Sequence, residues 1–244
     1  MDGQQNEKKE IGDHLFSWKR NFDNFIYHHK IALIMGAAIL AFVIFCITQC
    51  AQRTPGDVNV AYIGITEINS EHYANLQSAL CEMLGEDLNG DGKIQADFTH
   101  FLYMTQSQVD SVRASGKPVD MQALMTVQTQ LDLEFAAGSI VIYFIDRDVY
   151  KELSGRQGLF MPLEDSLGFI PEDANDAYSL KMGNLQSWEY FMGLNDFPAG
   201  TVIAVRDIQL SEENDPKKLE LYERNLKMLK RIYYYTYKTE NEEE

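Results

Sequence analysis

The sequence predicts one α/β domain that follows a single transmembrane helix. Residues Ile31 to Ile47 form an uncharged apolar run. From Val58 onward, short strand patterns alternate with helical patterns, which is typical of a sheet with helices on both of its faces. Residues 140–145 read IVIYFI, as in a strand that is buried on both faces. We therefore expect a mixed, mostly parallel sheet covered by helices on both faces.

The apolar run has the length of a membrane span, because about 17 to 20 helical residues cover about 25 to 30 Å. The distribution of basic residues favours a cytoplasmic N-terminus. Only Arg53 is basic in the thirty residues after Ala51, whereas five basic residues precede the run: Lys8, Lys9, Lys19, Arg20 and Lys30. We therefore expect a single-pass protein of the cell membrane whose C-terminal domain lies outside.

The apolar run has two alternative interpretations besides an uncleaved membrane anchor. A cleaved signal peptide would also export the domain, but thirty residues is long for its basic segment, and the apolar core exceeds the usual 7 to 15 residues or so. A lipidated cysteine at Cys46 or Cys50 would need a small residue before it, whereas Phe45 and Gln49 stand there. Both alternatives fit the sequence less well than a signal anchor.

Composition divides the chain into six segments. Aromatic and basic residues alternate just before the span, which is typical of a helix that lies at the membrane interface. The expected segments are a disordered cytoplasmic tail (1–13), an amphipathic juxtamembrane helix (14–30), a transmembrane helix (31–50), a tether (51–57), an extracytoplasmic α/β domain (58–236) and an acidic tail (237–244).

The net charge of −16 belongs to the exported part, because residues 1–52 carry five basic and five acidic residues. A field of this sign repels nucleic acid, so we expect no nucleic-acid partner. Cys81 is the single cysteine after the span, so an apolar core rather than a disulfide must stabilise the domain. Ala32 and Gly36 form a small-xxx-small pair, which makes a homodimer through the span a further hypothesis.

Hydrophobic periodicity predicts the elements of the domain. The predicted strands are 58–65, 94–102, 140–145 and 201–205, and the predicted helices are 70–84, 120–138, 149–153 and 217–235. Between residues 103 and 119 we expect a loop that contains Gly116 and Pro118. Residues 164–197 give no clear pattern because turn residues interrupt them.

Polar residues follow three of the predicted strands. In open α/β sheets, ligands gather beyond the carboxyl ends of the strands. The candidate ligand-binding residues are Thr66, Glu67, Asp146, Arg147, Arg206 and Asp207. They meet at one edge of the sheet only if the three strands run parallel, and an antiparallel strand would separate its residues from the others.

The segment Asp87 to Ile94 resembles the first half of EF-hand and dockerin-type calcium loops. Oxygen-bearing side chains stand at loop positions 1, 3 and 5, a glycine at position 6 and an apolar residue at position 8, and the carbonyl at position 7 would be a further ligand. The expected ligands are Asp87, Asn89, Asp91 and the carbonyl of Lys93. Position 12, normally a bidentate carboxylate, is Phe98, so we expect at most weak calcium binding and no required cofactor. The alternative is a tight turn.

Signatures of catalysis are scarce. His72 and His100 are the histidines of the exported part, and the sequence contains no Gly-x-Ser-x-Gly, no His-Glu-x-x-His and no P-loop. No catalytic residue is therefore predicted. An exported hydrolase that uses acidic residues stays an alternative because carboxylates are abundant.

Residues 124–165, LMTVQTQLDLEFAAGSIVIYFIDRDVYKELSGRQGLFMPLED, resemble the first lobe of extracellular solute-binding proteins of ABC importers. The shared features are a helix that ends in Ala-Ala-Gly, a strand, a short helix and a Gly-Leu-x-x-Pro-Leu turn. The exported part is shorter than the two lobes of that family, and Ser139 stands where the family has an acidic residue. The layout of the whole chain is also similar to that of single-span proteins of Gram-positive gut bacteria, which implies no function.

The resemblance implies a membrane-anchored binding or interaction domain without catalysis, and its partner would be a small solute, a peptide or a protein. A second hypothesis is an accessory or structural subunit of a membrane complex. The hydrolase is the third. Binding of a solute would distinguish the first hypothesis from the others, because a ligand of the folded state raises its melting temperature.

Overall fold

The computed structural model describes residues 27, 29–32, 34–46, 48 and 56–236, which belong to two compact units that divide between Thr54 and Pro55. In the first unit, the helix His29–Cys46 is long and apolar enough to cross a membrane. The predicted tails 1–13 and 237–244 lie outside the described residues, as does most of the predicted juxtamembrane helix 14–30 and of the tether 51–57.

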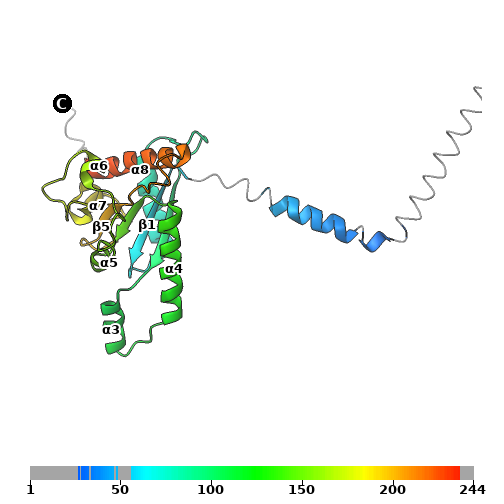
Figure 1. Ribbon diagram of the computed structural model, residues 1–244, viewed down its shortest axis with the longest axis horizontal. Coiled ribbons are helices and arrows are strands. Elements are labelled where there is room, and N and C mark those ends of the chain that lie inside the picture. Colours follow the sequence, from blue (N-terminus) through cyan, green and yellow to red (C-terminus); the bar gives the residue numbers. More distant parts are fainter. Residues whose placement is uncertain (1–26, 28, 33, 47, 49–55, 237–244) are drawn as a thin grey trace, which may run out of the picture. The chain divides into compact units, whose positions relative to one another are not determined.

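The second unit contains a mixed five-stranded sheet with the strand order β2-β1-β3-β5-β4 (Figure 1). Strand β1 pairs in parallel with β2 and β3, whereas β5 pairs antiparallel with both β3 and β4. The strands are β1 (Val58–Gly64), β2 (Ala96–Leu102), β3 (Ile142–Ile145), β4 (Ser179–Lys181) and β5 (Val202–Val205). The predicted mixed α/β sheet is thereby confirmed, and β5 runs opposite to its neighbours.

Helices connect these strands, and local sequence signals set their ends. Asn69, Asp120 and Asp215 accept backbone hydrogen bonds as N-caps, while Gly85 and Gly138 end their helices in the left-handed conformation. The helices are α2 (Ser70–Leu84), α3 (Gln106–Ala114), α4 (Met121–Ala137), α5 (Arg147–Leu153), α6 (Leu163–Leu167), the 3₁₀ helix η1 (Met182–Asn184), α7 (Gln186–Tyr190) and α8 (Pro216–Tyr234).

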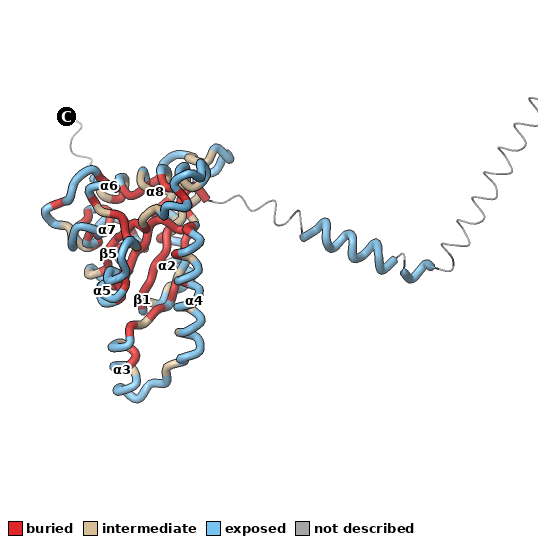
Figure 2. The backbone as a smooth tube through the Cα atoms, viewed as in Figure 1, coloured by how far each residue is buried: buried red, intermediate tan, exposed pale blue. Residues whose placement is uncertain are grey.

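Two apolar cores lie on the two faces of the sheet. Side chains alternate along β1, so Val60 and Tyr62 belong to the core that packs against α2 and α8, whereas Ala61 and Ile63 belong to the core that packs against α4 and α5. Figure 2 shows the strands as a continuous buried layer between more exposed helices. The sheet is therefore covered on both faces, so side chains that could bind a ligand lie at its edges.

The structure adds elements that the sequence did not predict. Helix α3 replaces the expected loop and begins with a capping box in which Thr105 and Gln108 bond each other's backbone. It buries Val109 and is otherwise polar, which explains its weak apolar pattern. Residues 164–197 contain α6, β4, η1 and α7, each of which has five residues or fewer. Helix α3 and the first half of α4 extend beyond the strands (Figure 1).

Candidate functional site

The carboxyl ends of β1 and β3 lie side by side at one edge of the sheet. Ile63 pairs with Ile145, and the N–H of Asp146 donates to the carbonyl of Ile63 at 2.9 Å. Helix α2 connects β1 to β2 on one side of β1, whereas β3 lies on the other side of it. The strand order therefore reverses at β1, and this is the place where open α/β sheets bind ligands.

The carboxylate of Asp146 joins the two strand ends. One of its oxygens accepts the hydroxyl of Tyr62 at 2.8 Å, and the other accepts the N–H of Ile65 at 2.9 Å. The Tyr62 hydroxyl in turn accepts the N–H of Thr66 at 3.2 Å. A Cβ atom at Gly64 would overlap the Asp146 carboxyl group and the Tyr62 hydroxyl, so glycine allows this close approach. The backbone around Thr66 is thereby held in one conformation.

His100 stands beside this network on β2. It pairs with Tyr62 across the strands, and their ring centroids are 5.5 Å apart. Its Nε2 atom is buried and has no hydrogen-bond partner among the residues that the structure describes. Burial lowers the pKa of His100 and the nearby His72 lowers it further, while Asp146 acts in the opposite direction. His100 is therefore neutral at pH 7.

A second histidine, His72, contacts the segment 193–197, which lies beside the end of α7. The Nε2 atom of His72 on α2 lies 2.8 Å from the carbonyl oxygen of Gly193 and 3.8 Å from a carboxylate oxygen of Asp196. The ring of Phe197 packs between His72 and Tyr62, with centroid distances of 4.9 and 4.7 Å. These contacts hold the connection between α7 and β5 against α2.

A hollow of about 360 Å³ opens at this edge. Thr66 and Glu67 line it from the end of β1, and Asn195 and Asp196 line it from the opposite side, together with residues of α2. Its polar groups are amides, carboxylates, a hydroxyl and the imidazole of His72, which suit a polar ligand better than an apolar one. Both oxygens of the Asp146 carboxylate already accept hydrogen bonds from the protein. This carboxylate therefore holds the backbone at Ile65 and Thr66 in place rather than serving as a general base.

The six predicted ligand residues do not form one site. Thr66, Glu67 and Asp146 meet at the carboxyl edge, and Arg147 follows Asp146 there but lines a separate hollow of about 260 Å³ with Asp173 and Lys181. Arg206 and Asp207 follow β5, whose last residue, Val205, pairs with Ile142 at the start of β3. Because β5 is antiparallel to β3, they lie at the opposite end of the sheet, and the expectation of one common edge is wrong for them.

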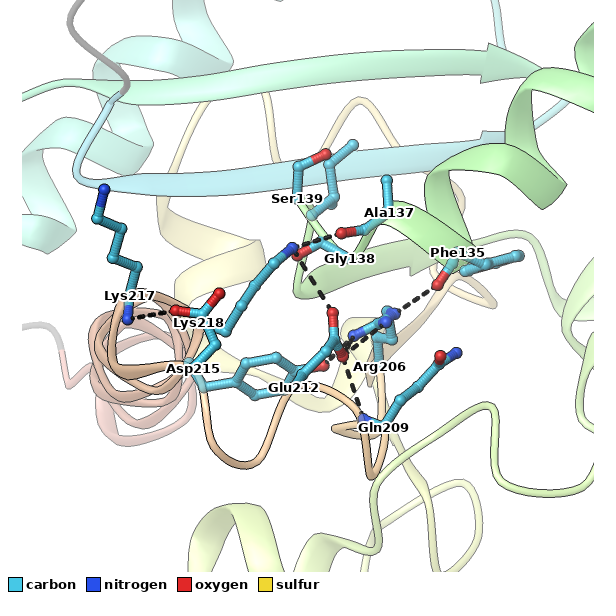
Figure 3. A network of polar contacts seen from close by, with 12 residues as sticks. Phe135, Ala137, Gly138, Ser139, Arg206, Gln209, Glu212, Asp215, Lys217 and Lys218 are labelled. Atoms are coloured by element: carbon cyan, nitrogen blue, oxygen red, sulfur yellow. Dashed lines mark hydrogen bonds and ion pairs between the residues drawn. The ribbon is translucent and has the colours of Figure 1, made fainter.

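Arg206 instead makes a buried structural network (Figure 3). Its guanidinium donates twice to one oxygen of Glu212 at 2.8 Å, and to the carbonyl oxygen of Phe135 at 2.8 Å. Burial raises the pKa of Glu212, but the bonds from Arg206 and from the backbone N–H of Gln209, together with the charges of Arg206 and Lys218, lower it, and the net shift is downward. A Cβ at Gly138 would overlap both charged groups, so this glycine leaves them room. The Tyr222 hydroxyl accepts a further hydrogen bond from Arg206, so the buried guanidinium is bonded through all three of its nitrogen atoms.

In the predicted calcium loop, side-chain oxygens accept hydrogen bonds from backbone N–H groups of the same loop. The carboxylate of Asp87 accepts the N–H groups of Gly90 and Gly92 at 2.7 Å, and Asp91 accepts the N–H of Lys93 at 2.9 Å. The bond from Gly92 is the main cause that lowers the pKa of Asp87. The buried carboxylate of Asp57 holds the loop from below by accepting the N–H groups of Leu88, Asn89 and Gln95. Within the described ranges, no group of three or more His, Cys, Asp or Glu side chains is arranged for a metal ion.

Sequence patterns do not indicate Asn195 and Asp196, because both lie in the region 164–197, where turn residues interrupt the periodicity. The only sequence signal for this part of the site is Asn69, whose capping position places the next turn of α2 at the end of β1. Comparisons of the chain with protein-family models, with curated proteins and with solved structures find no match. The resemblance of residues 124–165 to a solute-binding lobe stays a prediction.

Proposed function

We propose that the protein is a membrane-anchored binding protein whose extracytoplasmic domain holds a polar solute, without catalysis, at the carboxyl ends of β1 and β3. The observation that supports this proposal is the hollow lined by Thr66, Glu67, Asn195 and Asp196 at the point where the strand order reverses. The bonds of Asp146 and Tyr62 hold the loop at Thr66 before any ligand arrives, which favours binding because little order has to be gained.

The helix His29–Cys46 serves as the anchor in this proposal. Five basic residues before the apolar run Ile31 to Ile47 and few after it support an N-terminus in the cytoplasm and a binding domain outside. The acidic character of the exported part keeps that domain soluble beside the membrane.

The test is a thermal-shift screen of the full chain in mild detergent against amino acids, short peptides and sugars. A solute at 100 times its dissociation constant adds about 2.7 kcal/mol of stability by mass action. We expect Asn195→Ala and Asp196→Ala to abolish the shift, whereas Glu223→Ala, on the exposed face of α8, leaves it unchanged. A solute that binds all three variants like the parent would place the site elsewhere.

A second candidate function, an accessory subunit of a membrane complex, is favoured by the outer face of α4. Residues 121–131 include no charged side chain, and Met125 and Leu133 are 66% and 65% exposed. Exposed apolar side chains on a helix that extends beyond the sheet are typical of protein contacts. Co-purification in mild detergent tests this function: a partner that is lost with Met125→Lys and kept with Glu223→Lys would support it.

A further inference from the structure

A third hollow, of about 430 Å³, lies at the other end of the sheet. Its lining includes Asp207, which follows β5, and Phe160, which is bridged to Arg206. The N–H of Asp207 donates to the carbonyl of Leu159 at 2.9 Å, so the two segments are fastened together. Since the end of β5 lies beside the start of β3, this hollow is separate from the site at Thr66 and Asp196.

Aromatic rings form one wall of this hollow. Tyr150 and Phe160 are both buried, and their ring centroids are 5.5 Å apart at an angle of 31°. The Tyr150 hydroxyl donates to Asp176 at 3.0 Å, which fixes the orientation of the ring. Tyr178 stands at the rim with 47% of its surface exposed, and its own N–H also donates to Asp176. The hollow therefore offers aromatic groups that are already in place.

Two charged side chains line this hollow, Asp207 and Arg156, and only Arg156 has an ion-pair partner, Asp132, which lies outside the lining. Burial raises the pKa of Asp207, and the nearby Asp165 adds to the effect. The two neighbouring arginines are already engaged, because Arg206 pairs with Glu212 and Arg156 pairs with Asp132 at 2.6 Å. In the part of the chain that the structure describes, no ion pair includes Asp207. A cation that entered the hollow would meet this carboxylate.

The combination distinguishes between kinds of cation. A hard metal ion such as Ca²⁺ needs about six oxygen ligands, and a hollow with aromatic walls does not supply them. An organic ammonium ion needs a negative group for its charge and aromatic faces for its body, since the negative face of each ring attracts a cation. We propose that this hollow binds a small organic ammonium ion, with its cationic head at Asp207 and its body against Tyr150, Phe160 and Tyr178.

The experiment is isothermal titration calorimetry of the full chain in detergent. The probes are tetramethylammonium, 2-phenylethylammonium and the uncharged analogue 2-phenylethanol. We expect saturable binding of the two cations and binding of the alcohol that is at least about tenfold weaker. Asp207→Asn keeps the shape of the side chain and removes its charge, so we expect about a tenfold or greater loss of affinity for the cations.

Two further variants locate the site. Tyr178→Ala removes an exposed ring and should weaken cation binding about three- to tenfold. Glu213→Gln, a neighbouring charge that does not line the hollow, should change the affinity less than about twofold. If Asp207→Asn lowers the melting temperature, Tyr178→Ala decides, because its exposed side chain contributes little to packing. Asp196→Ala should leave cation binding intact, which separates this site from the proposed solute site.

Three results would overturn the proposal. The first is equal affinity for 2-phenylethylammonium and 2-phenylethanol, because the carboxylate would then be irrelevant. The second is unchanged affinity of both Asp207→Asn and Tyr178→Ala. The third is the absence of saturable binding up to about 10 mM, a concentration that would half-saturate a site with a dissociation constant of about 10 mM.

Discussion

At the scale of single residues, Asp146 connects the fold to the proposed solute site. Its side chain is 8% exposed, and its two oxygens accept from Tyr62 and from the backbone of Ile65. Buried donors that lose their acceptor keep the full penalty of lost hydration. This carboxylate therefore stabilises the domain and shapes the loop that carries Thr66 and Glu67.

We expect Asp146→Ala to lower the free energy of unfolding by about 2 to 3 kcal/mol, because the Tyr62 hydroxyl and the Ile65 N–H would both be left unpaired. Urea unfolding of the full chain in detergent measures this change. The control is Asp148→Ala, which removes an exposed carboxylate paired with Lys151 and should change stability by less than about 0.5 kcal/mol. Similar losses in both variants would mean that the Asp146 bonds add nothing.

The Arg206–Glu212 pair predicts sensitivity to acid. The pKa of Glu212 in the folded protein is below its ordinary value of 4.5, so its contribution is present above that pH and is lost as the pH falls toward the lowered pKa. We expect Glu212→Gln to destabilise the domain by about 2 to 3 kcal/mol at pH 7, because a buried guanidinium loses its partner. The difference between parent and variant should shrink below about pH 4.5.

Thermal unfolding of both proteins at pH 7 and at pH 3.5 measures this difference. Glu213→Gln is the matched control, because its side chain is exposed while that of Glu212 is buried. A difference between parent and Glu212→Gln that stayed constant across the pH range would show that the charge of Glu212 does not contribute.

At the scale of secondary structure, the long helices and the strongly apolar strands were predictable, whereas α3 and the shortest elements between residues 163 and 190 were not. Helices α2, α4 and α8 have 15, 17 and 19 residues with an apolar stripe and recognisable caps, so periodicity and capping residues locate them within a few positions. Strand β4 has three residues, and α6 and α7 have five each, which is too short for a period to appear. Tertiary contacts rather than local preference determine these short elements, and the same holds for the connection after α7 that carries Asn195 and Asp196.

The loop after α2 is the element on which calcium binding remains a prediction. Its oxygens already accept backbone bonds, and Phe98 at position 12 is 8% exposed in the core, so no bidentate carboxylate can complete the shell from there. We expect a dissociation constant of about 10⁻⁴ to 10⁻³ M. At about 2 mM calcium, the melting temperature of the full chain should rise by about 2 to 4 °C relative to chelator.

The variant Asp91→Ala should abolish this rise, because it removes one of three side-chain ligands, whereas Asp110→Ala on α3 should preserve it. Equal melting temperatures with calcium and with chelator would leave the segment as a turn held by Asp57. A rise that survived Asp91→Ala would place the ion at another position.

At the scale of the whole molecule, the sequence shows which segments form strands but not in which direction they run. Buried strands such as β3 and β5 have similar apolar composition whether they are parallel or antiparallel, because both of their faces are covered. Because β5 runs antiparallel to β3, Arg206 and Asp207 lie at the opposite end of the sheet from the carboxyl ends of β1 and β3. This direction of β5 also places Asp207 in the lining of the hollow of about 430 Å³, whose other lining residues come from the segment 150–178.

The orientation in the membrane is the prediction on which both binding proposals depend, since an extracellular ligand reaches only a domain that lies outside. Charges before the span favour a cytoplasmic N-terminus. We expect a membrane-impermeant maleimide to label Ser115→Cys in intact cells, because Ser115 is exposed at the end of α3, and to label Gln4→Cys only after permeabilisation. Both cysteines are introduced after Cys81→Ser, which removes the native thiol of the second unit. Labelling of Gln4→Cys alone in intact cells would show that the topology is the opposite one. The proposed solute site and the proposed ammonium site would then both lie in the cytoplasm.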